Sequence, residues 1–346
     1  MDPCAAVVES TAWVVGQATS VSIDPSALDA FVSELDAQCS GGLPAWDDGG
    51  WHFGDDASSG GPLTAQYVLV LDALNWCFWP SETAMEYDTL ASGLTRALRA
   101  DPSAFSADAL QALTPDVLRS WFAPHHLPGA EERVRKLREV GAVLAGSFGE
   151  LAANVVAAAG GSAIALVRLV AAHFPGFRDE CVYVAAHETR QVFLYKRAQI
   201  FVADVWAAYG RCTGRTDLGD TAASPPPALA PYAFSDIGAL TCFADYRLPQ
   251  LLSARGVLVY SPTLAAAVLA REEIPAGSAP EVEVRAATVQ AVLRLQARLA
   301  EVRRARDGDA ASRAPLNVEV DWALWNWGER SLAELPPHHR TRTVFY

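Results

Sequence analysis

The 346-residue sequence is poor in basic residues. Its 27 lysines and arginines are outnumbered by 40 aspartates and glutamates, which gives a formal net charge of -13 at pH 7. Proteins that follow nucleic-acid phosphates have the opposite balance, because clustered Lys and Arg neutralise the backbone. The charge therefore argues against direct nucleic-acid binding and favours a small neutral or cationic ligand, while a local basic pocket stays compatible with it.

Features of secreted and membrane proteins are also missing. No basic stretch follows Met1, and Glu9 interrupts the first apolar run, so a secretory signal is not expected. The longest uncharged stretch, residues 151–167, is short for a membrane span and contains a Gly-Gly pair at 160–161. We expect two buried helical pieces there, in a soluble, cytoplasmic protein that contacts no membrane.

The six cysteines show no metal-binding or redox spacing, because no two of them form Cys-x-x-Cys. Cys77, Cys181 and Cys242 lie in apolar runs, where a reduced cysteine behaves as a small hydrophobe. The histidine pairs at 125–126 and 338–339 have no partners at metal-ligand spacing. No metal site is expected.

Apolar residues, by contrast, are plentiful. The sequence is 51% hydrophobic and 19% charged, which is enough apolar material for a buried core. Length alone permits two domains, but there is neither an internal repeat nor a regular alternation of strands and helices. We predict a mainly α protein with one compact helical domain over 1–346 and at most a few short strands. Within it, 1–60 would hold an N-terminal helix and an aromatic loop, and 61–346 the core.

Helical spacing of apolar residues places most of the expected elements. The first clear helix start is at Asp24 and Pro25, which suit the cap and the first turn. A Gly-rich loop with aromatic anchors follows at 41–61. Further helices are predicted over 64–79, 106–121, 128–148, 192–209, 236–260, 262–271, 281–306 and 318–330, with a short strand over 181–184. Residues 212–231 form the best loop candidate.

Four aspartates stand out because they are embedded in apolar, aromatic runs. They are Asp72, Asp204, Asp245 and Asp321. Burying a carboxylate is costly unless it is paired, so four such residues suggest a pocket for a flat ligand. Any one of them is equally compatible with a structural ion pair or helix cap. Asp204 shares its predicted helix with two basic residues and is the best structural candidate, whereas Asp245 and Asp321 are the better functional ones.

Five segments together resemble a known family. In chain order they are Leu-Asp-Ala-Leu-Asn-Trp-Cys-Phe-Trp (71–79), Leu-Tyr-Lys-Arg-Ala-Gln-Ile-Phe-Val-Ala-Asp-Val-Trp (194–206), Leu-Thr-Cys-Phe-Ala-Asp-Tyr-Arg-Leu-Pro-Gln (240–250), Glu-Val-Glu-Val-Arg-Ala (281–286) and His-Arg-Thr-Arg-Thr-Val-Phe-Tyr (339–346). The chain resembles the queuosine salvage protein family, the queuosine 5'-phosphate N-glycosylases. The resemblance covers most of the chain.

This resemblance implies a helical fold similar to that of helical DNA glycosylases. It also implies hydrolysis of queuosine 5'-phosphate to queuine and ribose 5-phosphate, with queuine returning to tRNA modification, and no metal or organic cofactor. A non-catalytic queuosine-binding protein is one alternative. A glycosylase of damaged DNA is another, which the net charge of -13 opposes. The oligomeric state stays open.

The resemblance also carries over site residues. The aspartate that acts at the sugar matches Asp245, with Phe243 as the pocket phenylalanine. The aspartate that contacts the base matches Asp321, beside Trp322. A second acid of that block is replaced by Asn326, which puts in doubt any role there that needs a negative charge. The family's pocket histidine has no clear counterpart.

The chemistry of queuine explains why such residues would be needed. Queuine is a 7-deazaguanine, so protonation of N7 cannot help it leave. A carboxylate at the sugar can stabilise an oxocarbenium-like species and activate water, and a second one can accept from N1–H and the 2-amino group. The secondary amine of its side chain also favours an acidic pocket. Asp72 and Asn75 are further substrate-binding candidates, and Lys196, Arg197 and Arg247 are candidates for the 5'-phosphate.

Overall fold

Helices make up most of the structure, a computed structural model that describes residues 1–39, 42–43, 46–47, 49–80, 85–213, 226–307 and 314–346. The expected fold class, a mainly α single domain with few short strands, is confirmed. The helices are α1 (Pro3–Gln17), α2 (Pro25–Gln38), α3 (Pro62–Leu74), α4 (Tyr87–Ala100), α5 (Ala107–Ala112), α6 (Pro115–Ser120), α7 (Ala130–Ser147), α8 (Ala152–Ala158), α9 (Ala163–His173), α10 (Lys196–Thr213), α11 (Arg247–Ala254), α12 (Pro262–Leu269), α13 (Ala279–Asp307) and α14 (Asn317–Arg330).

The strands form two small antiparallel pairs. β1 (Val21–Ile23) pairs with β4 (Leu258–Tyr260), with Ser22 opposite Val259. β2 (Glu180–Val184) pairs with β3 (Thr189–Phe193), which confirms the strand predicted over 181–184.

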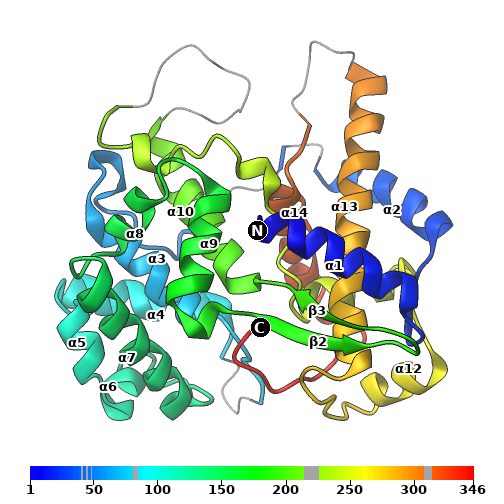
Figure 1. The fold of residues 1–346 in the computed structure, drawn as a ribbon, viewed down its shortest axis with the longest axis horizontal. Coiled ribbons are helices and arrows are strands. Elements are labelled where there is room, and N and C mark those ends of the chain that lie inside the picture. The colour runs from blue at the N-terminus through cyan, green and yellow to red at the C-terminus, as the bar shows by residue number, and fades with distance from the viewer. Residues whose placement is uncertain (40–41, 44–45, 48, 81–84, 214–225, 308–313) are drawn as a thin grey trace.

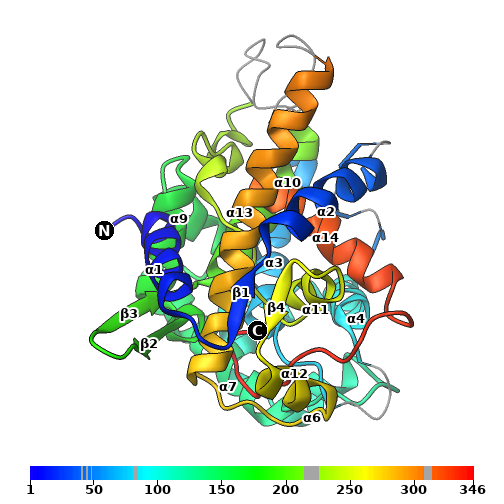
Figure 2. The same cartoon turned by 90° about the vertical axis from the view of Figure 1, so that its right-hand side faces the viewer.

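The long helix α13 organises one half of the molecule. At about 1.5 Å per residue its 29 residues extend over about 43 Å. Figure 1 shows α3 to α10 gathered on one side of the molecule and α1, α2, α12, α13 and α14 on the other. In Figure 2, α1 lies on one side of α13, while α2 and α14 lie on the other. One hydrophobic cluster contains buried residues of α2, α3, α7, α10, α13 and α14, so both halves share a core.

Two helices begin with the same Asp-Pro signal. The Asp24 carboxylate accepts hydrogen bonds from the amides of Ser26 (2.8 Å) and Ala27 (2.9 Å), which confirms the helix start predicted there. Asp2 does the same for Cys4 (2.8 Å), and Pro3 opens α1. Helix α1 was not among the predicted elements, although its start has the same pattern.

Several predicted helices are wrong in part; the one predicted over 64–79 ends at Leu74. The helix predicted over 192–209 begins only at Lys196, because residues up to Phe193 pair in β3 and Tyr195 has a left-handed φ of 50°. In the region 236–260 only α11 is an α-helix, since the carboxylate of Asp236 accepts from Ser162 (2.7 Å) and binds the start of α9. The predicted helix over 106–121 is two short helices, α5 and α6.

Some expectations concern features that span the chain. The two helical pieces expected around 151–167 are present as α8 and α9. Within the described residues, no single helix has the length and apolar character of a membrane span. Only α7 and α8 taken together, with a bend between them, meet both criteria. Most of the loop predicted over 212–231 lies outside the described residues.

Candidate active site

A pocket of about 900 Å³, including its open mouth, lies where α10, α11 and α14 meet the segment after α3. Of the ten site residues predicted from the sequence, eight line this pocket. They are Asn75, Lys196, Phe243, Asp245, Arg247, Asp321, Trp322 and Asn326. Segments that are far apart in the sequence therefore meet at one cavity, as the pocket hypothesis requires.

Two helices present long faces to the pocket. Helix α10 contributes Lys196, Ile200 and Asp204, which follow one another at four-residue intervals and so share a side of the helix. Helix α14 contributes residues from successive turns: Asp321, Trp322, Trp325, Asn326 and Glu329. The pocket is thus bounded by two rigid elements rather than by loops alone.

Asp245 lies at the start of α11 and is half-buried. Its Oδ1 accepts hydrogen bonds from the backbone amides of Arg247 (2.8 Å) and Leu248 (3.1 Å). These two donors fix the orientation of the carboxylate. Because both bonds are made to Oδ1, Oδ2 is the oxygen that can act on a ligand.

Asp321 is deeper in the pocket, with 4% of its surface exposed. Its Oδ1 accepts a hydrogen bond of 2.7 Å from the amide of Phe243. Burial raises the pKa of Asp321 well above its usual value, against the stabilising effect of that amide, and the negative charge of Asp245 raises it further. The Phe243 bond links the two predicted functional aspartates, because Phe243 precedes Asp245 by two residues.

Two predicted cations line the pocket with different surroundings. Burial lowers the pKa of Lys196, while the charge of Asp245 counteracts this effect. The Lys196 ammonium donates to the carbonyl oxygen of Asn75 at 3.2 Å. Arg247 donates through Nε to Glu329 (2.7 Å) and lies 3.9 Å from Glu86. The positive charge of Arg247 is therefore largely balanced by neighbouring acids.

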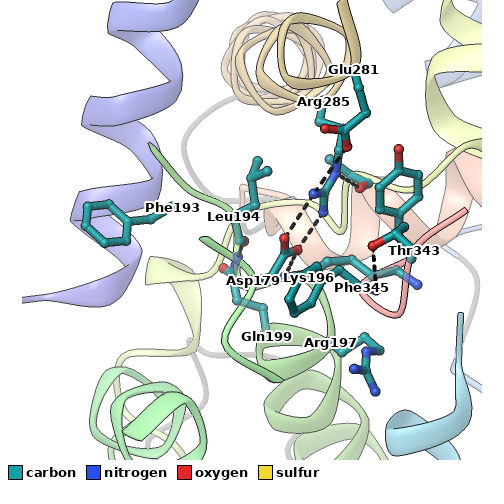
Figure 3. A network of polar contacts seen from close by, with 12 residues as sticks. Asp179, Phe193, Leu194, Lys196, Arg197, Gln199, Glu281, Arg285, Thr343 and Phe345 are labelled. Atoms are coloured by element: carbon teal, nitrogen blue, oxygen red, sulfur yellow. Dashed lines mark hydrogen bonds and ion pairs between the residues drawn. The ribbon is translucent and has the colours of Figure 1, made fainter. Parts of the chain in front are cut away.

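A buried ion pair holds the site to α13, as Figure 3 shows. Arg285 donates to both carboxylate oxygens of Asp179, at 3.0 and 2.6 Å. Asp179 also accepts from the amide of Lys196 at 3.2 Å and so caps the start of α10. A third bond joins Arg285 to the carbonyl of Ala244 (3.0 Å), immediately before Asp245. One guanidinium thereby positions both sides of the pocket.

The structure does not bring Asp72 and Arg197 to the pocket lining. Arg197 donates to the carbonyl oxygens of Asp72 (3.1 Å) and Ala73 (2.7 Å), and it also binds the carbonyl of Gly176. These bonds tie α10 to the last turn of α3 and engage both terminal nitrogens of the guanidinium within the protein. Asp72 is fully buried behind α10, and burial followed by the charge of Asp204 raises its pKa well above the usual value.

Several lining residues were not predicted from the sequence. They are mostly aromatic or acidic: Trp46, Trp51, Glu86, Tyr87, Asp204, Tyr246, Trp325, Glu329 and Tyr346. Glu329 follows Asp321 by eight residues on α14, so helical spacing alone could have identified it. Glu86 and Tyr87 carry no local signal, because only tertiary packing brings the start of α4 to the pocket. Asp204 was interpreted as a structural residue, yet it is part of the lining.

A hydrogen-bond chain positions the aromatic side of the pocket. His52 contacts Asp47 through Nδ1 (2.7 Å) and Tyr87 through Nε2 (2.9 Å). The Trp46 ring stacks on His52 with centroids 4.1 Å apart. On the other side, the rings of Tyr87 and Trp325 meet edge to face at 5.5 Å. The aromatic loop predicted around 41–61 therefore does fold onto the site.

The described residues contain no group of three or more His, Cys, Asp or Glu side chains arranged to hold a metal ion. The pocket is lined by five acidic side chains, by aromatic walls and by two cations, Lys196 and Arg247. Such an arrangement is suited to holding a flat, hydrogen-bonding base beside a group on which a carboxylate can act. The fold and site thus define a helical protein with an acidic, aromatic pocket.

Comparison with known proteins matches the chain to one family. Residues 56–346 match the family described as queuosine salvage protein. A relative from Dictyostelium discoideum is 41% identical over 355 residues, covering 100% of both chains. A relative from Sphaerobacter thermophilus is 40% identical over 351 residues and covers 98% of this chain and 97% of its own.

A mouse relative is more distant, at 32% identity over 297 residues and 81% of each chain. All three relatives are named queuosine 5'-phosphate N-glycosylase/hydrolase. The chain belongs to the queuosine salvage protein family, and the resemblance inferred from the five sequence segments is confirmed.

Proposed function

We propose that this protein is an N-glycosylase that hydrolyses queuosine 5'-phosphate to queuine and ribose 5-phosphate. The observation that carries the proposal is the pair of aspartates in one pocket. Asp321 accepts a hydrogen bond of 2.7 Å from the Phe243 amide. Asp245 lies two residues after Phe243, at the start of α11. The names of the relatives support the same reaction.

Asp321 is assigned to the base. Its Oδ1 is bonded to Phe243, so Oδ2 accepts from the N1–H and 2-amino group of the deazaguanine. Phe243 and Trp322 enclose the ring. Asn75 and Asn326 offer amide groups along the same wall, and they can bind polar groups of the ligand without a charge.

Asp245 is assigned to the bond that breaks. The C1'–N9 bond cleaves, its electron pair leaves with the base, and positive charge develops on the sugar. The Asp245 carboxylate stabilises that charge and accepts a proton from the attacking water, whose oxygen forms the new bond to C1'. The departing base takes up a proton in turn, so that one water is consumed. Lys196 lines the same pocket; burial lowers the pKa of its ammonium group, and the charge of Asp245 counteracts that effect.

The 5'-phosphate is assigned to the side of the pocket next to Arg247. A second cavity shares Phe78, Glu86, Tyr246 and Arg247 with the pocket and adds Arg340. Arg340 can bind a phosphate group there, with Arg247 as a secondary donor because Glu329 and Glu86 largely balance its charge. His338 also lines this cavity, but burial lowers its pKa to about 4 and its Nδ1 contacts the carbonyl of His339 at 2.7 Å, so it adds no positive charge at neutral pH.

The proposal is tested by incubating the purified protein with queuosine 5'-phosphate and measuring free queuine and ribose 5-phosphate by chromatography. We expect release of both products in equal amounts. Asp245→Asn should reduce kcat by at least about a hundredfold, since the charge that acts at the transition state is lost. Asparagine still caps a helix, so the variant should fold and bind queuine as before.

Two results would contradict this assignment. If the wild-type protein binds queuosine 5'-phosphate and releases no queuine, the protein is a binder and not an N-glycosylase. If Asp245→Asn keeps the wild-type kcat, another group acts at the sugar. A single-stranded or duplex DNA containing a damaged base should give no product, because the net charge of -13 disfavours polynucleotides.

A further inference from the structure

Among the acidic residues that line the pocket, Asp204 neither acts in the proposed reaction nor pairs with Arg247, as Glu86 and Glu329 do. Asp204 lines the pocket, and only 2% of its surface is exposed, so the pocket is where its side chain can meet a ligand. Burial raises the pKa of Asp204 to about 7, against the lowering influence of the Trp46 indole and the Lys196 ammonium. Ionising a buried carboxyl group with a raised pKa costs free energy unless a cation binds beside it.

Aromatic side chains surround this end of the pocket. Trp46, Tyr87, Trp322 and Trp325 line the same cavity, and three independent packing contacts hold them in place. Trp46 stacks on His52 at 4.1 Å, Tyr87 meets Trp325 at 5.5 Å, and Trp322 stacks with Trp206 of α10 at 6.3 Å. Tryptophan and tyrosine faces attract organic cations, which is the basis of aromatic cages for substituted ammonium groups.

Asp204 is separated from the reacting bond. It follows Lys196 by eight residues on the same face of α10, which corresponds to about 12 Å at about 1.5 Å per residue. Lys196 lies at the Asp245 end, because its amide is bonded to Asp179, and Asp179 is paired with the Arg285 guanidinium that binds the carbonyl immediately before Asp245. Among charged residues, Asp204 has the largest effect on the pKa of Tyr87, at the aromatic end. The acid and the cage therefore lie together, away from the sugar site.

We propose that Asp204 and the surrounding aromatic side chains, Trp46, Tyr87 and Trp325, bind the ammonium group carried by the 7-substituent of the base. This inference rests on the proposed function, since it takes queuosine 5'-phosphate as the substrate. The secondary amine of queuine is protonated near neutral pH and is attached to the five-membered ring, remote from the edge that Asp321 reads. Asp204 is thus a specificity residue: it selects 7-deazaguanine nucleotides that carry an amine.

The physical basis is mutual compensation of two charges. An ammonium group in the cage makes a charge-assisted hydrogen bond to the Asp204 carboxylate and faces the aromatic rings. A neutral 7-deazaguanine without the substituent leaves Asp204 with no cation to bind, so Asp204 can remain protonated at little cost. The contribution of Asp204 should therefore depend on the amine and be absent for a substrate that lacks it.

The test compares two substrates and two proteins. The substrates are queuosine 5'-phosphate and 7-deazaguanosine 5'-phosphate, which lacks the 7-substituent. In Asp204→Asn, kcat/KM for queuosine 5'-phosphate should fall by about tenfold or more, mainly through KM, as expected for loss of a charge-assisted bond. For 7-deazaguanosine 5'-phosphate, kcat/KM should change by less than about twofold, as expected when the lost group makes no differential contact.

An equal loss of activity toward both substrates would overturn the inference, because Asp204 would then act in bond cleavage or in folding. An unchanged KM for queuosine 5'-phosphate would overturn it as well. Asp36→Asn is the matched control: it removes a partly buried acid that pairs with Arg303 at 2.8 Å, and it should alter neither substrate's kinetics. Wild-type protein that releases no queuine would refute the proposed function instead, so the two failures are distinguishable.

Folding of the variant is checked by thermal unfolding. A carboxyl whose pKa is raised in the folded state contributes stability at low pH that is lost as the pH rises through about 7. Asp204→Asn removes this loss, so above pH 7 the variant should be at least as stable as the wild type. A lower melting temperature at that pH would attribute the kinetic change to misfolding and would count against the inference.

Discussion

At the scale of single residues, the two aspartates of the proposed mechanism differ in how their charges are held. Asp245 has two backbone donors on one oxygen at the start of α11. Asp321 has one such donor and is deeply buried, and burial raises its pKa. The first arrangement fixes the orientation of the carboxylate, whereas the second favours a carboxyl that ionises when a ligand supplies further donors.

This difference leads to a prediction for Asp321. Asp321→Ala leaves the N1–H and 2-amino donors of bound queuine unpaired, which costs about 1–3 kcal/mol. The Kd of queuine should therefore increase by at least about tenfold, since about 1.4 kcal/mol corresponds to that factor. Wild-type binding should release a proton, because the ligand stabilises the ionised form of a carboxyl whose pKa is raised in the free protein.

Isothermal titration calorimetry in buffers of different ionisation enthalpy measures both quantities. For the same reason, the wild-type affinity should weaken as the pH falls, and Asp321→Ala should lose that dependence. An unchanged Kd for queuine in the folded variant would mean that the base is recognised elsewhere. Asn75 and Asn326, which line the same pocket, would then be the next residues to test.

At the scale of secondary-structure elements, local signals account for some of the site and not for the rest. The start of α2 follows from Asp24 and Pro25, and the shared face of Asp321, Trp325 and Glu329 on α14 follows from helical spacing. The start of α10 does not, because the cap of Lys196 is Asp179, which lies 17 residues earlier and across a hairpin. Local propensity favoured a longer helix there, and tertiary contacts override it.

The element that completes the pocket from outside is the C-terminal segment. Its backbone is held by a bond of 2.7 Å from the amide of Ile274 to the carbonyl of Arg340, and by one of 3.0 Å from Cys77 to the carbonyl of Tyr346. The Tyr346 side chain lines the pocket and lies under Arg285 at 4.2 Å. Contacts between residues so far apart in the sequence produce no local sequence pattern. Tyr346 was therefore recognised only as part of a family segment.

Arg340 gives this segment a test. Its guanidinium lies 5.4 Å from the Trp79 ring and lines the cavity proposed for the 5'-phosphate. Arg340→Ala should raise the KM for queuosine 5'-phosphate by about tenfold, as expected for loss of a charged hydrogen bond of about 1.5 kcal/mol. The KM for the nucleoside queuosine, which has no phosphate, should stay unchanged.

Arg342→Ala is the matched control for this experiment. Arg342 contacts the same Trp79 ring at 5.6 Å, but it lines a different cavity and is paired with Glu273 at 3.4 Å. Its removal should leave the KM of both substrates near the wild-type value. A similar rise of KM for nucleotide and nucleoside in Arg340→Ala would place the phosphate elsewhere.

At the scale of the whole molecule, the site depends on how the two halves are joined. The α3–α10 half supplies Lys196 and Asp204, while α11 and α14 pack with α13 and supply Asp245 and Asp321. Arg285 of α13 connects them, since it binds Asp179 before α10 and the carbonyl of Ala244 before α11. The sequence identified the aspartates of the pocket. No sequence pattern indicated that Arg285 and Asp179 set their relative positions.

The last prediction concerns this connection. Arg285 is 3% exposed and ion-paired with Asp179, so Arg285→Met leaves a buried carboxylate without its partner. Breaking a buried pair in this way should lower the free energy of unfolding by about 3–5 kcal/mol. The double variant Asp179→Leu with Arg285→Met removes both charges of this pair and should recover part of that stability, although the buried Glu281, which lies 3.7 Å from Arg285, still loses its partner. Its activity should nevertheless stay low, since the cap of α10 and the bond to Ala244 are both lost. Urea unfolding and kcat measured on all three proteins separate the two effects. Near wild-type kcat in a stable double variant would show that Arg285 stabilises the fold without positioning the pocket.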